Sequence, residues 1–139
     1  MRKLFLDTNI WLRFFLKDDS SQYKSVYELI SQIEQGKFRV YTSNIVLLET
    51  YYVLFQTYKI PHEQVLELID SIFEVRGITV IDRTDSRQAF QYLKKYNIKF
   101  ADCLIASQIS KMTYLVSFDK DFNKIREIKN VTPNKVLLL

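Results

Sequence analysis

The chain has 139 residues, of which 47% are hydrophobic and 26% charged, and its formal net charge is +4. Such a chain is expected to form a single globular domain over residues 1–139 and to bury about two-thirds of its unfolded surface. The basic balance favours polyanionic partners only weakly. The single cysteine excludes an internal disulfide and a cysteine-rich zinc site, and the single histidine makes Ser-His-Asp catalysis a poor explanation.

No stretch of the sequence resembles a signal peptide or a membrane span. The apolar residues after Arg2 and Lys3 are interrupted by Asp7, and the next apolar run is interrupted by Arg13. No uncharged run approaches the roughly 18 to 20 apolar residues that are needed to cross a bilayer. We therefore expect a cytoplasmic protein that does not bind or cross a membrane.

Apolar runs and helix-boundary residues predict strands that alternate with helices. The run Leu4–Leu6 lacks the alternation of a half-exposed strand, so we expect a parallel strand that is covered on both faces. In the helix that ends near Tyr96, Phe90 and Leu93 are expected to face inward. In chain order, the predicted elements are a strand over Leu4–Leu6, a helix capped by Thr8 or Asn9 and ending near Leu16, a helix over Ser21–Gln35 stopped by Gly36, a strand over Phe38–Thr42, a helix over Asn44–Tyr58 capped by Ser43, a helix from Pro61 closed by Gly77, a strand over Ile78–Ile81, a helix capped by Thr84 and stopped by Asn97, a helix over Phe100–Lys111, a strand over Tyr114–Val116, a short helical turn, and a closing strand over Lys135–Leu139.

This order predicts an α/β fold with a mainly parallel five-stranded sheet, helices on both faces and right-handed crossovers. One helix is unusual, because the segment Asn44–Tyr58 leaves almost no polar face. A helix that is apolar all round is either buried or covered by a partner. Glu49 is its only charged residue.

Carboxylates recur where the chain leaves or approaches the predicted strands. Asp7 ends the first strand and Asp119 follows the strand Tyr114–Val116, so both would line the carboxyl edge of the sheet if these strands are neighbours. Glu49 lies about a turn and a half into its helix, and Asp102 lies in the first turn of its own helix. Asp121 is a candidate fifth acid.

Each acid also has a structural explanation. Asp7 can cap a helix, Asp102 can favour the positive end of its helix, and Asp119 with Asp121 can form a polar turn. Glu49 is the exception, because an unpaired carboxylate on an apolar helix costs several kcal/mol to bury. It needs a positive partner or a metal ion.

Four or five carboxylates in one cleft cannot all ionise unaided, and a divalent cation resolves their repulsion. The ligands offered are hard oxygens without a cluster of histidine or cysteine, which favours Mg²⁺ or Mn²⁺ over Zn²⁺. The chemistry associated with such a site is metal-assisted hydrolysis of a phosphodiester by a bound water.

These motifs together resemble the PIN-domain nucleases, and in particular the small VapC-type toxins of toxin–antitoxin pairs. The resemblance covers essentially the whole chain. It rests on four stretches in the family's order: Leu6-Asp7-Thr8-Asn9-Ile10-Trp11-Leu12, Ser43 to Glu49, Phe100-Ala101-Asp102 to Ala106, and Tyr114-Leu-Val-Ser117-Phe-Asp119-Lys-Asp121-Phe122. Each stretch is weak evidence alone, and all four in order are rather specific.

The resemblance implies a PIN-like three-layer α/β/α sandwich and a Mg²⁺- or Mn²⁺-dependent endoribonuclease. Asp7, Glu49, Asp102 and Asp119 would be its catalytic and metal-binding acids, and Asp121 an additional acid of variable role. Asn9 would orient Asp7, and Ser117 would hydrogen-bond a metal-bound water or the scissile phosphate. The resemblance also implies a homodimer and an antitoxin partner that blocks the cleft, for which the helix Asn44–Tyr58 is a candidate contact, with plain core burial the alternative.

Substrate RNA would be bound by cations near these motifs, for which the candidates are Arg13, Lys17, Lys99 and Lys120. Each of them is also an ordinary candidate for a solvated surface charge. The aromatic residues near the motifs could stack on bases, but core packing is the alternative that general statistics favour. They are Trp11, Phe14, Phe15 and Tyr51.

Three other functions remain open from the sequence. One is a PIN nuclease of RNA processing or of DNA structures that has no antitoxin. Another is a catalytically silent module that binds RNA or protein. The third is a phospho-acceptor receiver-like domain, which requires a pair of adjacent acids after the first strand and a lysine at the end of the last, and neither is well placed here.

Overall fold

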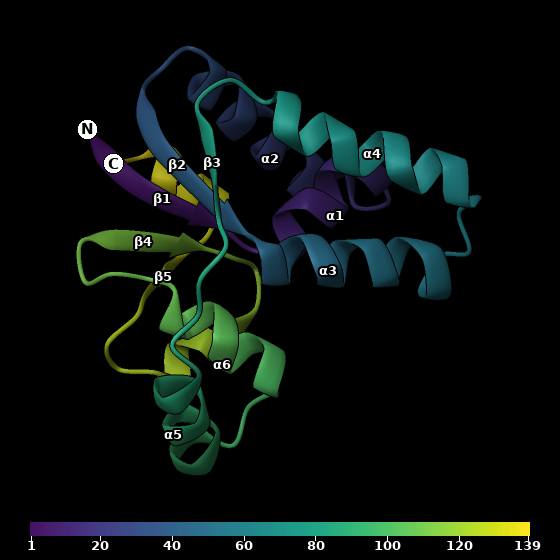
Figure 1. Ribbon diagram of the computed structural model, residues 1–139. Coiled ribbons are helices and arrows are strands. Elements are labelled where there is room, and N and C mark those ends of the chain that lie inside the picture. The colour runs from purple at the N-terminus through teal and green to yellow at the C-terminus, as the bar shows by residue number, and fades with distance from the viewer.

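The structure is a computed structural model that describes residues 1–139. Helices and strands alternate along the chain as the sequence predicts (Figure 1). The elements are β1 (Arg2–Leu6), α1 (Thr8–Leu16), α2 (Ser20–Glu34), β2 (Phe38–Ser43), α3 (Asn44–Tyr52), the π-helical turn η1 (Val53–Thr57), α4 (His62–Glu74), β3 (Ile78–Ile81), α5 (Ser86–Tyr96), α6 (Phe100–Ser107), β4 (Thr113–Val116), the 3₁₀ turn η2 (Lys120–Lys124), β5 (Lys129–Val131) and α7 (Pro133–Leu137).

The five strands form one sheet in the order β3-β2-β1-β4-β5, and every neighbouring pair is parallel. The predicted five-stranded parallel sheet is therefore confirmed. Since all strands run the same way, all their carboxyl ends lie along one edge of the sheet. β1 is the central strand, and β4 lies directly beside it with Leu6 opposite Val116.

Helices cover both faces of the sheet (Figure 1). α5 and α6 pack against each other on the opposite side from α1 and α2. α3 with η1 runs beside α4, and the two project together away from the sheet as an arm. None of the helices combines the length and the apolar character that crossing a bilayer requires.

The first strand is the centre of the hydrophobic core. Leu4, Phe5 and Leu6 are completely buried, as expected for a parallel strand covered on both faces. The indole of Trp11 is also completely buried, and its Nε1–H donates to Thr42 Oγ1 at 3.3 Å. Thr42 Oγ1 in turn donates to the main-chain oxygen of Leu6 at 3.1 Å, so one hydroxyl joins α1, β1 and β2.

The predicted closing strand over Lys135–Leu139 is wrong. The last strand is the earlier and more polar segment Lys129–Val131, and Pro133–Leu137 is a helix. Pro133 occupies the first helical position, where its missing N–H costs nothing and its fixed φ favours a helix. Of the apolar residues at the end of the chain, Val136 is buried, whereas Leu138 is 87% exposed.

Two further boundaries differ from the prediction. Asp85, not Thr84, caps α5, because its carboxylate accepts from the N–H of Gln88 at 3.1 Å. α6 ends at Ser107, four residues earlier than expected, since residues 108–112 form the turn into β4.

The inward face of α5 also differs from the prediction. Ala89 and Tyr92 are buried in the core, Leu93 is half-buried, and Phe90 is 51% exposed. The inward stripe is thus rotated by about one residue from the predicted one.

The Thr42 hydroxyl provides a test of this packing. Replacing it with the isosteric Thr42→Val leaves the Trp11 indole N–H buried without an acceptor, which should lower the free energy of unfolding by about 1–3 kcal/mol. Urea unfolding would measure this. The matched control is Thr79→Val, on the exposed face of β3, which should change stability by less than about 0.5 kcal/mol. Equal stability of the two variants would contradict the buried role of the hydroxyl.

Candidate active site

A pocket of about 170 Å³ lies at the carboxyl edge of the sheet. The four predicted acids all line it, although they come from four separate segments of the chain. Besides Asp7, Glu49, Asp102 and Asp119, its polar lining consists of Thr8, Asn9 and Lys99. The strand order explains the convergence, because β1 and β4 are neighbours and end side by side.

Asp7 is fixed at the centre of this edge. Its main-chain N–H donates to the oxygen of Val116 at 3.1 Å, and the residue is only 4% exposed. Asp7 occupies the N-cap position of α1, but its side chain makes no capping hydrogen bond. The capping explanation for this carboxylate therefore fails, and the predicted caps Thr8 and Asn9 are instead the first residues of the helix.

Ser117 joins the acids at the ends of β1 and β4. Its hydroxyl donates to Asp7 Oδ2 at 2.7 Å and accepts from the main-chain N–H of Asp119 at 2.9 Å. Asn9 Nδ2 also donates to Ser117 Oγ at 3.1 Å, and Asn9 Oδ1 accepts from the N–H of Phe118 at 3.2 Å. The hydroxyl of Ser117 thus orients the acids at the ends of β1 and β4, and its predicted contact with a metal-bound water or the scissile phosphate stays a prediction.

Glu49 has a structural partner that the sequence did not reveal. Thr8 Oγ1 donates to Glu49 Oε1 at 2.9 Å, linking the start of α1 to α3. The carboxylate is half-buried and faces the same pocket as Asp7. A neutral hydroxyl orients this carboxylate without neutralising its charge, and the positive charge nearby is that of Lys99, which lines the same pocket.

Asp102 is the least satisfied of the four acids. It lies in the first turn of α6, is 6% exposed, and its Oδ2 is buried without any hydrogen-bond partner. A buried and unpaired polar atom is uncommon in proteins and marks a place where a ligand or ion is expected.

Burial and mutual repulsion raise the pKa values of these carboxyls. Burial raises the pKa of Asp7 to about 7 against the opposing hydrogen bond from Ser117, and the charges of Glu49 and Asp119 add to the rise. The pKa of Asp102 is likewise raised to about 7, first by burial and then by the three neighbouring acids, with Lys99 opposing. Burial also raises the pKa of Glu49, while the Thr8 hydrogen bond and the charge of Lys99 lower it.

The donor set suits a divalent cation. No three of the chain's His, Cys, Asp and Glu side chains stand in the arrangement of a preformed metal site. Mg²⁺, however, is commonly held by only one or two carboxylates and keeps several waters, and the pocket is large enough for such a hydrated ion. The unpartnered oxygen of Asp102 and the repulsion among hard carboxylates are what a hard cation would relieve.

The remaining acid and three of the four candidate cations lie outside the pocket. Asp121 forms an ion pair with Lys124 at 3.4 Å on the surface. Its main-chain N–H donates to Asp119 Oδ1 at 2.9 Å. Lys17 lies over the ring of Tyr23, with 5.4 Å between the ammonium and the ring centre. Lys120 lines a separate neighbouring cavity of about 200 Å³.

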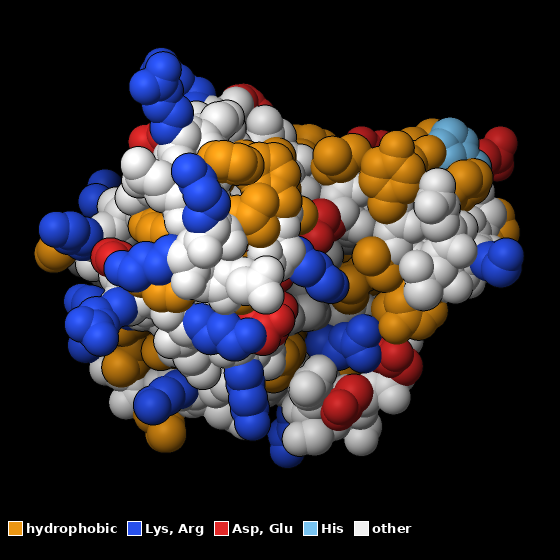
Figure 2. Space-filling model, turned by 90° about the horizontal axis from the view of Figure 1, so that it is seen from below, with side chains coloured by type: hydrophobic (Ala, Val, Ile, Leu, Met, Phe, Trp, Pro, Cys, Tyr) orange, Lys and Arg blue, Asp and Glu red, His pale blue; other side chains and the backbone are white.

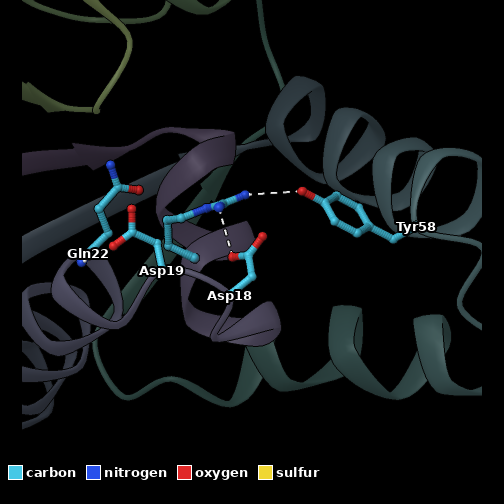
Figure 3. Close-up of polar contacts among 5 residues, drawn as sticks. Asp18, Asp19, Gln22 and Tyr58 are labelled. Carbon is cyan, nitrogen blue, oxygen red and sulfur yellow. Dashed lines mark hydrogen bonds and ion pairs between the residues drawn. The ribbon is translucent and has the colours of Figure 1, made fainter.

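Arg13 lies outside the pocket and binds Asp18 and Tyr58, which are labelled in Figure 3. Its guanidinium donates to Asp18 Oδ1 at 2.8 Å and to the hydroxyl of Tyr58 at 3.4 Å, so it ties the end of α1 to the far end of the arm. Of the four candidate cations, only Lys99 lines the acid pocket, and it is exposed there.

The aromatic candidates are core or arm residues. Trp11 is completely buried, and Phe14 and Phe15 pack against the core. Tyr51 stacks with Phe55, and its hydroxyl lies 3.1 Å from His62 Nε2. None of these aromatic side chains lines the acid pocket.

The family model described as the PIN domain matches residues 4–128 of this sequence. The chain belongs to the PIN-domain family. A curated relative named VapC ribonuclease, from Aquifex aeolicus (strain VF5), is 26% identical to this PIN domain over 130 residues, covering 92% of this chain and 95% of the relative.

Solved structures share the fold. A chain of VapBC2 from Rickettsia felis, crystallised with a DNA fragment from their promoter, has a TM-score of 0.71 at 22% identity and covers 94% of this PIN domain and 98% of that chain. VapC20 of Mycobacterium tuberculosis, described as a sarcin-ricin loop cleaving toxin, has a TM-score of 0.69 at 23% identity, with 86% and 92% covered. The family resemblance and the PIN-like three-layer fold predicted from the sequence are thus confirmed.

The raised carboxyl pKa values predict how the stability of the metal-free protein depends on pH. Asp7 and Asp102 hold their protons up to about pH 7 when folded but only to about pH 4 when unfolded. The folded state therefore binds more protons between these values, and the free energy of unfolding should fall as pH rises from about 4 to 7.

Asp102→Asn should flatten this fall and raise stability near pH 8 in EDTA by about 1 kcal/mol or more, because the amide cannot ionise. Thermal unfolding across the pH range would measure this change in stability. The control is Asp70→Asn, which alters an exposed residue of α4. A variant whose stability follows the wild-type pH profile would show that the pKa of the Asp102 carboxyl is not raised.

Proposed function

We propose that this PIN domain is a Mg²⁺- or Mn²⁺-dependent endoribonuclease and the toxin of a type II toxin–antitoxin pair. The observation that carries the proposal is the convergence of Asp7, Glu49, Asp102 and Asp119 on one pocket. The relatives named VapC support it, since they match this chain over nearly its whole length. A bound divalent cation would supply an activated water as the nucleophile and stabilise charge on the leaving oxygen.

The chain's own residues prepare the site for this chemistry. Ser117 holds Asp7 and the backbone of Asp119 in fixed orientations, and Thr8 does the same for Glu49. These carboxylates and the unpartnered oxygen of Asp102 are the groups that would hold the cation. Cation binding favours the ionised carboxyls, so it would displace the protons that burial retains on Asp7 and Asp102.

Lys99 would bind the phosphate beside the bond that is cut. It is the one cation that lines the pocket, and it lies immediately before α6, which carries Asp102. Its charge attracts the substrate and also lowers the pKa of Glu49 and Asp102.

The arm of α3, η1 and α4 is where we place the antitoxin. For the helix Asn44–Tyr58 the sequence left two alternatives, burial in the core and contact with a partner. Val46 and Leu54 of this segment are buried in the core. The same helical segment nevertheless exposes large apolar side chains, visible on the arm at the right of Figure 2. They include Leu48, Tyr52, Phe55 and Tyr58, which are 39–53% exposed. An apolar surface of this kind is typical of a protein-binding site, and a homodimer is the other assembly that the resemblance implies.

Among members of the PIN-domain family, the alternative to weigh is a nuclease that has no antitoxin. A PIN nuclease without an antitoxin would use the same pocket, and nothing in the geometry of the acids favours it. A cytoplasmic location remains our expectation.

Removal of one acid tests the reaction. Asp119→Ala should lower RNA cleavage by roughly 100-fold or more, because a ligand that is worth several kcal/mol of charge stabilisation is lost. Cleavage of total RNA with Mg²⁺ or Mn²⁺ would measure this, and EDTA should abolish cleavage by the unchanged protein. Asp70→Ala on the exposed face of α4 is the control. Full activity of Asp119→Ala, or activity in EDTA, would refute the site.

Lys99 tests the substrate contact. Lys99→Ala should lower kcat/KM by roughly tenfold, since a phosphate loses a charge-assisted contact. The rising limb of the pH–rate profile should also move to higher pH, because Glu49 and Asp102 lose the cation that lowers their pKa. The matched control is Lys95→Ala, an exposed lysine of α5 that does not line the pocket. A pH–rate profile that does not move would show that Lys99 is an ordinary solvated surface charge.

A further inference from the structure

Cationic side chains gather at the edge of the sheet opposite the acid pocket. Because the five strands are parallel, the segments that lead into them share one edge, the amino edge. The segments at residues 1–3, 36–39, 109–114 and 129–131 contain no acid, whereas Glu34, Glu74 and Glu127 lie a few residues before β2, β3 and β5. We define the amino-edge patch by the cations in these segments, which are Arg2, Lys3, Lys37, Arg39, Lys111 and Lys129.

The pairing of the strands brings these cations together. Lys3 lies opposite both Arg39 on β2 and Thr113 on β4. The guanidinium of Arg2 and the ammonium of Lys129 lie 6.0 and 5.5 Å from the centre of the same ring, that of Tyr114. Arg2, Lys3, Tyr114 and Lys129 also line one cavity of about 550 Å³.

No ion pair within the chain involves these cations. The ion pairs of the molecule are Arg13 with Asp18 and Lys124 with Asp121, so none involves the amino-edge patch. Five of its six cations are exposed, and Lys3 is half-buried. Lysine and arginine side chains crowd the left of the molecule in Figure 2, the side on which β1 begins in Figure 1. Like charges on neighbouring strands repel, and the contacts of Arg2 and Lys129 with the Tyr114 ring offset this repulsion only in part.

We propose that the amino-edge patch is a second nucleic-acid-binding surface that holds the phosphate backbone of a structured RNA substrate away from the point of cleavage. The proposal rests on the proposed function only in naming RNA as the occupant. Neighbouring strands lie about 4.8 Å apart, so the edge is roughly 20 Å wide and can meet several phosphates.

A second copy of the chain is a poor occupant. In a two-fold dimer each surface meets itself, which would place these cations against their own copies. The length of β1 separates the patch from Asp7 by about 16 Å. An RNA that contacts both surfaces must therefore extend well beyond the scissile bond, which indicates a folded RNA rather than a short oligonucleotide.

Reversal of two charges tests the proposal. Arg39→Glu/Lys111→Glu changes exposed side chains that make no hydrogen bond or ion pair. Lys24→Glu/Lys59→Glu is the charge-matched control, on α2 and at the tip of the arm. All proteins would carry Asp119→Asn and be kept in EDTA, so that binding is measured without turnover. The probes are an RNA hairpin of about 20 base pairs and a DNA duplex of the same sequence, titrated over a range of salt concentrations.

We expect the amino-edge variant to bind the hairpin at least roughly tenfold more weakly, with the slope of log K against log salt reduced by about 0.9 for each lost contact. The control should stay within about twofold. Equal affinity and slope in the two variants would overturn the proposal and leave the nuclease site untouched. Loss of DNA binding alone would overturn RNA as the occupant. A change of oligomeric state in gel filtration without a change in RNA affinity would assign the patch to a protein interface.

Discussion

The hydrogen bond from Ser117 to Asp7 is the contact on which the site depends. It spans two strands that are far apart in sequence, and it exists because β1 and β4 are paired with Leu6 opposite Val116. One residue beyond that pair, both strands have ended, and the carboxylate of Asp7 and the hydroxyl of Ser117 therefore lie side by side. The same hydroxyl accepts from the N–H of Asp119, which brings a second acid into the cluster. A slip of one residue between these strands would turn one of the two side chains to the other face and abolish the pocket.

The site is held together against its own electrostatics. Buried carboxylates that face one another destabilise a fold unless a cation joins them, and the raised pKa values of Asp7 and Asp102 express that cost. The fold tolerates it because the strand residues Leu4–Leu6 are completely buried, and Glu49 and Asp102 lie on the helices α3 and α6. Asp7 and Asp119 lie just beyond the ends of β1 and β4, where the Ser117 hydroxyl holds them. Neutral donors orient the carboxylates from Ser117 and Thr8 without neutralising them, so the pocket keeps its demand for positive charge. That demand supports our proposal that the pocket binds a divalent cation and a phosphate.

Much of this arrangement could be predicted from the sequence, and the misses have a common cause. The carboxyl-edge rule was enough to place Asp7 and Asp119 on one edge of the sheet, because it depends only on parallel topology. That the two acids are neighbours depends on the strand order, which the sequence left open and the pairing of β1 with β4 provides. The choice among cations was not predictable, since proximity in sequence favoured Arg13 as much as Lys99, and only the fold shows that Arg13 is paired with Asp18. The contact between Thr8 and Glu49 was missed for the same reason: a threonine after a strand looks like a cap whatever its hydroxyl binds. The closing strand failed because apolar content outweighed Pro133, whose position decides for a helix.

The parallel sheet gives the molecule a polarity that no single motif contains. Acids gather where strands end and cations where strands begin, so a net charge of +4 conceals two surfaces of opposite sign. The acidic pocket repels a polyanion until a cation is bound, whereas the amino edge attracts it at any time. If the amino-edge patch binds RNA as we propose, the protein would capture a folded RNA before its phosphodiester reaches the acids. Attraction at one edge then compensates for repulsion at the other, and both follow from strands that all run the same way.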